Sequence, residues 1–222
     1  QMSFPDQPQQ AMELVEGPTL AERIGHRPLP LDEALGIAKQ IAEALEAAHE
    51  KGIVHRDVKP ENILCVSQSF PLRVKLTDFG LSKVVSSGDG KSGDISMRSQ
   101  CGTAYYLAPE VVNNVSYGKP VDMWACGVVG YVMLAGKFPF YGDSEEKFTQ
   151  RLRLGVSFPN KEWRSISQNA KLLIRGLLDP NPETRLTAEQ ALEHRWLNDD
   201  SDILTTSSTP SSAVGDARER ER

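Results

Sequence analysis

Three short motifs in a fixed order constrain this chain more than any other feature of its sequence. The first, His55-Arg56-Asp57-Val58-Lys59-Pro60-Glu61-Asn62, lies between a long helical pattern and a short apolar stretch. Asp78-Phe79-Gly80 and Ala108-Pro109-Glu110 follow it along the chain. Each motif alone is compatible with an ordinary turn, but all three in this order form a very specific pattern. The chain is therefore expected to build one defined site from these segments.

Apolar periodicity predicts a mostly helical domain with a short hairpin. Apolar residues recur at helical spacing over 31–51, and Gly52 ends that helix. Further helical patterns lie near 120–136, 144–154, 168–178 and 187–196. The segments 63–66 and 74–76 are apolar and flank a turn, which predicts two short strands.

The composition is that of an ordinary globular protein. Apolar residues make up 39% of the 222-residue chain, charged residues make up 25%, and the net charge is −5. With this charge, no nucleic-acid or membrane partner is expected. The longest apolar run, 125–136, is too short for a membrane helix. The cysteines Cys65, Cys101 and Cys126 are odd in number and far apart, which favours a reduced intracellular location, cytoplasmic or nuclear.

The motifs resemble those of the eukaryotic-type serine/threonine protein kinases over about residues 12–197. Within that family, the chain looks most like the calcium/calmodulin-dependent kinase group, including its checkpoint-kinase-like members. Four segments carry this closer likeness: Cys101–Glu110, Asp122–Trp124, Gly136–Phe140 and Arg185–Trp196. The resemblance implies an α+β fold, namely the C-terminal lobe of a protein kinase, mostly α-helical with short β-hairpins and with the N-terminal lobe absent or truncated.

The resemblance also divides the chain into parts. Residues 1–17 are expected to be a remnant of the last small-lobe strand and the hinge, 18–198 the large lobe, and 199–222 a disordered tail. The activation segment is expected to span 78–110. A Gly-x-Gly-x-x-Gly pattern at 88–93 falls inside that segment, so we interpret it as a flexible loop and not as a phosphate-binding loop.

The resemblance assigns catalysis to five residues, with ATP and Mg²⁺ as the cofactors. Asp57 is expected to accept the hydroxyl proton of the substrate. Lys59 is expected to neutralise charge on the transferred phosphoryl group, and its presence implies Ser/Thr substrates. Asn62 and Asp78 are expected to give oxygen ligands to Mg²⁺, and Thr103 to contact Asp57 and Lys59.

The nucleotide site is expected to include Glu13, Val15, Glu61 and Leu64. The backbone of residues 13–15 would supply the hinge hydrogen bonds, and Leu64 would form the floor under adenine. Glu61 is also placed to attract an arginine just before the phosphorylated residue of a substrate.

Substrate preference is expected to be at most mildly basic. Thr19 and Val132 stand where some basophilic relatives carry an acid. The pocket for the residue after the phosphorylated one would involve Gln100, Ala104 and Leu107.

Arg56, Lys83 and Ser99 are expected to form a regulatory switch. Family members with an arginine before the base are usually switched by a phosphate on the activation segment, and Ser99 stands at that position. A phosphate there would add about −1.5 to −2 charges and could pair with Arg56 and Lys83, whether an upstream kinase or autophosphorylation adds it. The alternative is an exposed serine in a Ser-rich loop.

Three further residues are expected to support the site. Glu110 should form an ion pair with Arg185 and tie the activation segment to the helical part of the lobe. Because buried pairs often cost as much desolvation as they return, the value of this pair is positional. Asp122 should hold the backbone of the catalytic loop.

The sequence leaves three hypotheses open for this chain. The first is a Ser/Thr protein kinase that transfers the ATP γ-phosphate to hydroxyls of protein substrates. The second is a truncated, inactive lobe that serves as a docking module, because no glycine-rich loop, strand lysine or helix glutamate precedes residue 12. The third is a piece that completes its site with a small lobe from another chain. The intact residues Asp57, Lys59, Asn62 and Asp78 argue against a degenerate pseudokinase.

Overall fold

A computed structural model describes residues 17–25, 27–67, 71–84, 103–113, 115 and 118–198 of the chain. At positions 81, 83, 84 and 103 it describes the backbone alone. The small-lobe remnant predicted at 1–17, apart from Gly17, the Gly-x-Gly-x-x-Gly pattern at 88–93 and the tail predicted at 199–222 therefore lie outside the described residues.

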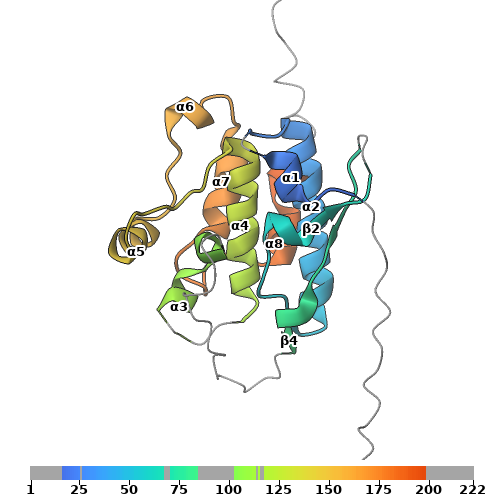
Figure 1. Cartoon of the computed structure of the whole chain (residues 1–222), viewed down its shortest axis with the longest axis horizontal. Helices are drawn as coiled ribbons and strands as arrows, with labels where there is room; N and C mark the ends of the chain where they lie inside the picture. Colours follow the sequence, from blue (N-terminus) through green and yellow to red (C-terminus); the bar gives the residue numbers. More distant parts are fainter. Residues whose placement is uncertain are drawn as a thin grey trace, which may run out of the picture.

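Helices form most of the described structure (Figure 1). The α-helices are α1 (Leu20–Ile24), α2 (Leu31–Glu50), α3 (Pro109–Val112), α4 (Pro120–Ala135), α5 (Glu145–Leu154), α6 (Asn160–Trp163), α7 (Gln168–Leu177), α8 (Ala188–Glu193) and α9 (Arg195–Asn198). Single 3₁₀ turns are η1 (Pro60–Asn62), η2 (Phe79–Leu81) and η3 (Thr103–Tyr106). The strands are β1 (Ile53–Val54), β2 (Ile63–Cys65), β3 (Val74–Leu76) and β4 (Lys83–Val84).

The central element is α4, which packs between α2 and α7 (Figure 1). Every residue from Val121 to Ala135 is buried, so this helix is covered on all sides, and Asp122 is its one charged residue. Glycines let α7 approach closely: a Cβ at Gly127 would lie 2.8 Å from Leu177 Cβ, and one at Gly130 would lie 2.8 Å from Ile174 Cδ1. The helix thus forms the axis on which the rest of the lobe packs.

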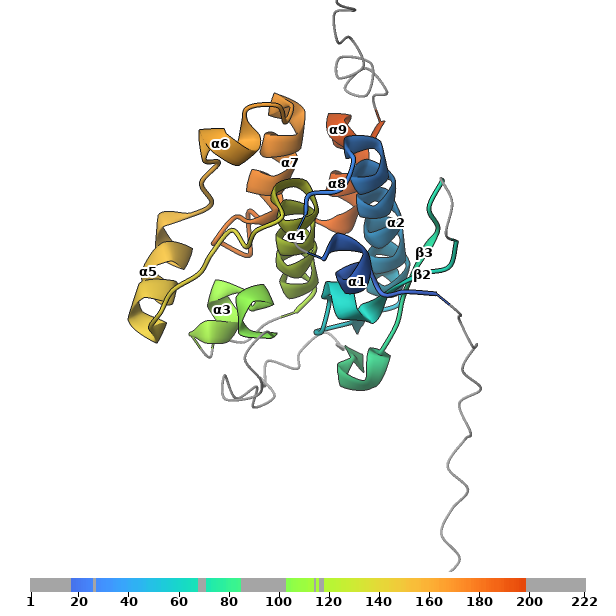
Figure 2. The ribbon, with the colours of Figure 1, turned by 45° about the horizontal axis from the view of Figure 1, so that its top comes forward.

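Two antiparallel strand pairs lie beside α2, and Figure 2 shows β2 and β3 next to that helix. In the β2–β3 pair, Ile63 is opposite Leu76 and Cys65 is opposite Val74. This hairpin confirms the strands predicted at 63–66 and 74–76. The β1–β4 pair brings the residues before the catalytic loop against the residues after Asp78.

The predicted long helices are confirmed, with one interruption. The segment predicted to be helical near 187–196 divides into α8 and α9 because His194 is extended, with ψ of 137°. The His194 ring then accepts a hydrogen bond at Nδ1 from the Trp196 backbone, 3.2 Å away, at the start of α9. Helices α1, α3 and α6 were not predicted, because they span only four or five residues.

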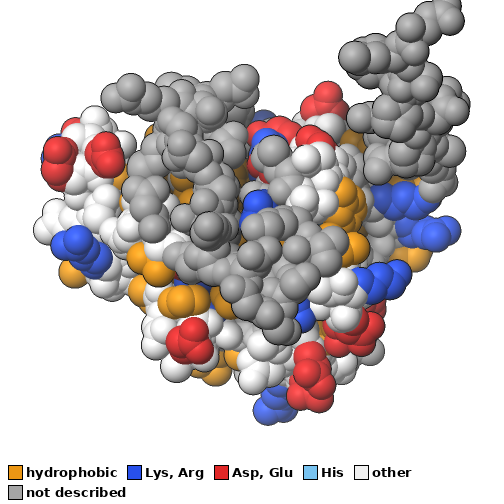
Figure 3. Space-filling view, turned by 90° about the horizontal axis from the view of Figure 1, so that it is seen from below, with side chains coloured by type: hydrophobic (Ala, Val, Ile, Leu, Met, Phe, Trp, Pro, Cys, Tyr) orange, Lys and Arg blue, Asp and Glu red, His pale blue; other side chains and the backbone are white. Residues whose placement is uncertain are grey.

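The described surface carries mixed charges and no membrane segment. Seen from below in Figure 3, hydrophobic, acidic and basic side chains are interspersed. Within the described ranges, no helix combines the length and the apolar character needed to cross a bilayer.

Candidate active site

The Asp57 carboxylate lies in a cage of hydrogen bonds within the loop between β1 and β2. Lys59 Nζ donates to both carboxylate oxygens, at 2.9 and 2.7 Å. Asn62 Nδ2 donates to Asp57 Oδ2 at 2.9 Å and to the Asp57 carbonyl at 2.8 Å. Asp57 is only 9% exposed, so the carboxylate is held in one orientation and keeps a narrow opening to solvent.

The buried carboxylate of Asp122, on α4, holds the loop that carries Asp57. Its Oδ2 accepts a hydrogen bond from the His55 backbone and its Oδ1 accepts one from the Arg56 backbone, both at 2.8 Å. Asp122 Oδ2 also contacts His49 Nε2, at the end of α2, at 2.8 Å. Arg56 has a φ of 71°, a left-handed conformation that is unusual for a residue with a side chain. These bonds to Asp122 hold the backbone at that strained position.

His55 connects the catalytic loop to the segment that ends in Asp78. The His55 Nδ1 atom accepts a hydrogen bond from the Asp57 backbone at 3.2 Å, and Nε2 lies 2.9 Å from the Thr77 carbonyl. Because a carbonyl only accepts, Nε2 carries the proton and the ring is neutral. The His55 ring also packs on Phe79, with ring centroids 4.5 Å apart. The two motifs are therefore joined through one buried imidazole.

Asn62 and Asp78 are suited to hold a magnesium ion. Thr77 donates its backbone N–H to the Asn62 carbonyl at 2.9 Å, which brings the end of β3 beside the catalytic loop. Both hydrogen bonds of the Asn62 side-chain amide use its nitrogen, which leaves its oxygen for a cation. Asp78 is exposed and has a φ of 60°, and one of its carboxylate oxygens accepts the Gly80 N–H at 3.3 Å. Two oxygen ligands fit Mg²⁺, which keeps water and phosphate as its other ligands.

The structure describes several of the residues assigned to nucleotide and substrate. Leu64 is half-buried on β2 and forms an isolated β-bridge with Thr19, and Glu61 is exposed in η1. Thr19 caps α1 in a capping box, in which the Glu22 carboxylate accepts the Thr19 N–H at 2.8 Å. Val132 is buried within α4.

Glu110 and Arg185, for which an ion pair was predicted, form two hydrogen bonds of 2.6 and 2.9 Å. Both residues are buried. Arg185 also donates to the Pro120 carbonyl at 2.8 Å and to the Asp179 carbonyl at 2.9 Å. Its guanidinium lies 5.1 Å from the centroid of the Trp124 ring. The pair thus fixes α3 against the start of α4 and the turn before α8.

Other predicted site residues are described in part or not at all. Thr103 lies in η3 and Lys83 in β4, but only their backbones are described. Ala104 and Leu107 are half-buried at the end of the activation segment. The remaining four predicted residues lie outside the described ranges: Glu13, Val15, Ser99 and Gln100.

Two histidines contribute contacts that the motif analysis did not assign. His55 was part of the first motif but had no role, and His49 was not singled out. Both are buried polar residues, at 0% and 7% exposure. A histidine at the end of an otherwise regular helix, six positions before the first motif, is a weak signal. Only the partner on α4, far along the sequence, reveals why it is there.

Comparison with known proteins identifies the class to which this fold and site belong. A family model described as "Protein kinase domain" matches residues 5–197, and the chain therefore belongs to the protein kinase family. The crystal structure titled "Rad53 kinase domain and SCD2 in complex with AMPPNP" is similar, with a TM-score of 0.70 and 37% identity over 84% of this chain and 68% of that one. This likeness confirms the predicted fold class.

Relatives place the chain in a particular part of that family. It is 41% identical to "Calcium-dependent protein kinase 21" of Oryza sativa subsp. japonica, over 93% of this chain and 34% of the relative. It is also 41% identical to "Calcium/calmodulin-dependent protein kinase type 1B" of Rattus norvegicus, over 86% of this chain and 54% of the relative. These relatives confirm the predicted resemblance to the calcium/calmodulin-dependent kinase group. The chain spans between a third and about half of their length.

Proposed function

We propose that this chain carries the catalytic centre of a serine/threonine protein kinase, which transfers the γ-phosphate of ATP to hydroxyl groups of protein substrates. The observation that carries the proposal is the Asp57 carboxylate held by Lys59 and Asn62 at 2.7 to 2.9 Å. Phosphoryl transfer depends on positioning and charge neutralisation, and this cage supplies a fixed proton acceptor beside a cation.

In the proposed reaction, the substrate hydroxyl oxygen bonds to the γ-phosphorus of ATP while Asp57 accepts the proton of that hydroxyl. The bond from that phosphorus to the bridging oxygen breaks, and ADP leaves with the electron pair. Lys59 offsets charge on the transferred group without leaving the Asp57 carboxylate, because its ammonium group has three donors. A magnesium ion held by Asn62 and Asp78 would compensate the charge of the phosphates.

The proposal is tested by phosphotransfer from Mg²⁺ and ATP to a generic Ser/Thr protein. We expect the purified chain to transfer phosphate and Asp57→Asn to lower the rate by about 10²-fold or more, because the amide cannot accept the proton. Asp143→Asn, the same isosteric change at an exposed carboxylate on another loop, should keep the rate. A folded chain without activity would contradict the proposal and favour the inactive docking module.

Activation by a phosphate on Ser99 is the regulatory part of the proposal. The phosphate would pair with Arg56 and Lys83, whether an upstream kinase or the chain itself adds it, and would order the activation segment. We expect Ser99→Ala to prevent activation by an upstream kinase, whereas Ser207→Ala, in the segment after α9, should not. Full activity with Ser99 shown to be unmodified by mass spectrometry would refute the switch.

We also propose an intracellular location, cytoplasmic or nuclear, and a mildly basic substrate preference. The buried thiols of Cys65 and Cys126 are free, as expected in a reducing intracellular compartment. Exposed Glu61 supports a mild preference for substrates with basic residues. Fractionation of cells that express the tagged protein tests the location, with recovery in a secreted fraction as the opposing result.

A further inference from the structure

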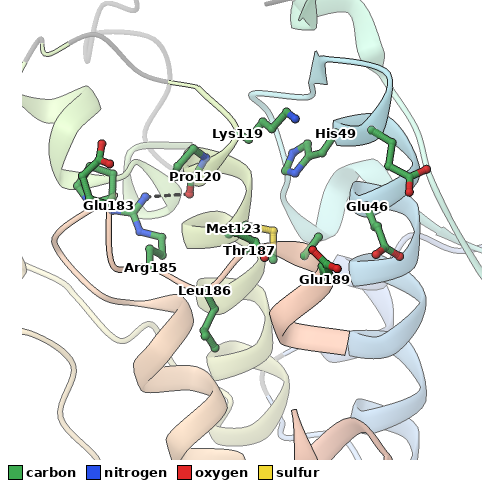
Figure 4. Close-up of a pocket in the computed structure, with 13 residues that line it drawn as sticks. Glu46, His49, Lys119, Pro120, Met123, Glu183, Arg185, Leu186, Thr187 and Glu189 are labelled. Carbon is green, nitrogen blue, oxygen red and sulfur yellow. Dashed lines mark hydrogen bonds between the residues drawn. The ribbon is translucent and has the colours of Figure 1, made fainter. Parts of the chain in front are cut away.

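A hollow of about 440 Å³ lies behind the catalytic loop, between the last turns of α2, the start of α4 and α8 (Figure 4). Its wall includes His49, whose Nε2 contacts the Asp122 carboxylate that supports the catalytic loop. Asp57, Lys59, Asn62 and Asp78 do not line it. The hollow is therefore distinct from the candidate active site, although one buried carboxylate connects the two.

The rim of the hollow is acidic. Four glutamates line it: Glu46, Glu50, Glu183 and Glu189. Figure 4 shows Glu46 and Glu189 coming from α2 and α8, with Glu183 across from them. Among the described residues, none of the four forms an ion pair.

Positive charge on the same wall does not balance these carboxylates. Arg185 lines the hollow, but its guanidinium is fully buried and is already paired with Glu110. Lys119 is exposed at the rim and has no ion-pair partner among the described residues. The rim thus presents four carboxylates against one available ammonium group.

The floor of the hollow is apolar. Met123 and Ala188 are buried in it, and Leu186 and Pro120 are half-buried. An arginine or lysine side chain matches this combination, because its methylene stem packs on apolar surface while its charged end reaches the carboxylates. A nucleic acid or an anionic lipid would instead be repelled by the rim.

We propose that this hollow docks a basic segment of a partner protein, with an arginine or lysine side chain lying across the floor toward Glu46 and Glu189. The charge complementarity of the rim and the apolar floor carry the proposal. It stands apart from the phosphotransfer function, because it requires no nucleotide and no catalytic residue.

The proposal is tested by fluorescence polarisation with the full chain and a labelled peptide of three arginines between glycines. We expect saturable binding, and no binding of the same peptide with glutamine in place of arginine. Glu46→Gln combined with Glu189→Gln should weaken binding by about tenfold, because two carboxylates that face the peptide are lost. Lys119→Gln should tighten binding by about threefold, which a merely destabilised variant would not do.

The matched control is Glu145→Gln combined with Glu146→Gln, which changes the net charge by the same amount on exposed positions of α5. This control should bind as the natural chain does. Equal weakening by both double variants would show that the peptide senses only net charge, and would overturn the proposal. So would the absence of binding, or tighter binding of the non-peptide cation spermine than of the peptide.

Discussion

At the scale of single residues, the candidate site is held by contacts that oppose local backbone preference. Arg56 and Asp78 both have positive φ, at 71° and 60°, and each such conformation costs on the order of 1 kcal/mol. The hydrogen bonds from His55 and Arg56 to Asp122 offset this cost at the first position. The strained residue next to Asp57 is therefore held in place by the buried Asp122 carboxylate.

Removing one partner of the buried Glu110–Arg185 pair should be strongly destabilising. We expect Arg185→Ala to lower the free energy of unfolding by about 3–5 kcal/mol, because it leaves the Glu110 carboxylate buried and unpaired. Urea denaturation followed by circular dichroism measures this loss.

A double variant separates this effect from lost packing. Glu110→Leu combined with Arg185→Met removes both charges, so it should recover part of the stability lost in Arg185→Ala. If the double variant were less stable than Arg185→Ala, the unpaired charge would not be the cause.

Sequence motifs predicted the residues around Asp57 because their contacts are local. Lys59 and Asn62 lie within five positions of Asp57, so the motif itself contains the cage. The links made by His49 and His55 could not be predicted in this way, since they reach Asp122 and Thr77 from other elements. The capping box of Thr19 and Glu22 did have a local signal, a threonine three positions before a glutamate, and it was missed.

At the scale of elements, the close approach of α4 and α7 depends on the absence of side chains at two positions. The apolar run at 125–136 indicated a buried helix, and α4 is that helix. The neighbours of α4 could not be predicted from this run, because an apolar run has no polar face that would mark which side packs on a partner. The β1–β4 pair was also missed, since strands of two residues carry no periodicity.

Two glycines in different helices should respond in opposite ways to the same substitution. Gly36 in α2 has no atom within 4 Å of an added Cβ, so Gly36→Ala should raise the free energy of unfolding by about 0.5–1 kcal/mol. Gly127 would place its Cβ 2.8 Å from Leu177 Cβ, so Gly127→Ala should lower it by about 1–3 kcal/mol. Thermal or urea unfolding of the two variants measures both effects. If both substitutions changed the free energy of unfolding in the same direction, the packing argument would be contradicted.

At the scale of the whole molecule, the described helices share one hydrophobic core. The buried cluster includes residues from α1, α2, α4, α5, α7, α8 and α9. Trp124, Trp163 and Trp196 lie in it with no exposed surface. A core that is continuous across these elements should unfold as one unit.

Cys126, in the centre of α4, should report this unfolding. Burial raises the pKa of its thiol to about 12, with a smaller contribution from nearby Asp122, so at pH 8 the folded chain holds it as an unreactive thiol. In the unfolded chain the pKa returns to its ordinary value, and the reactive thiolate is populated at pH 8.

We therefore expect brief iodoacetamide pulses at pH 8, across a urea series, to label Cys126 only as the chain unfolds. The labelling midpoint, read by peptide mass spectrometry, should coincide with the midpoint of circular dichroism. Labelling at urea concentrations well below that midpoint would show that α4 opens separately from the rest of the core.

Because the catalytic loop is attached to α4, the position of Asp57 does not depend on the length of the neighbouring β2–β3 turn. Asp122 holds the catalytic loop by accepting the His55 backbone N–H, and the β2–β3 ladder ends with Cys65 opposite Val74, before the connecting turn. Extra residues in that turn would add only a slowly growing closure entropy and would not shift Asp57. Residues can thus be added or removed at this tip without rebuilding the candidate active site.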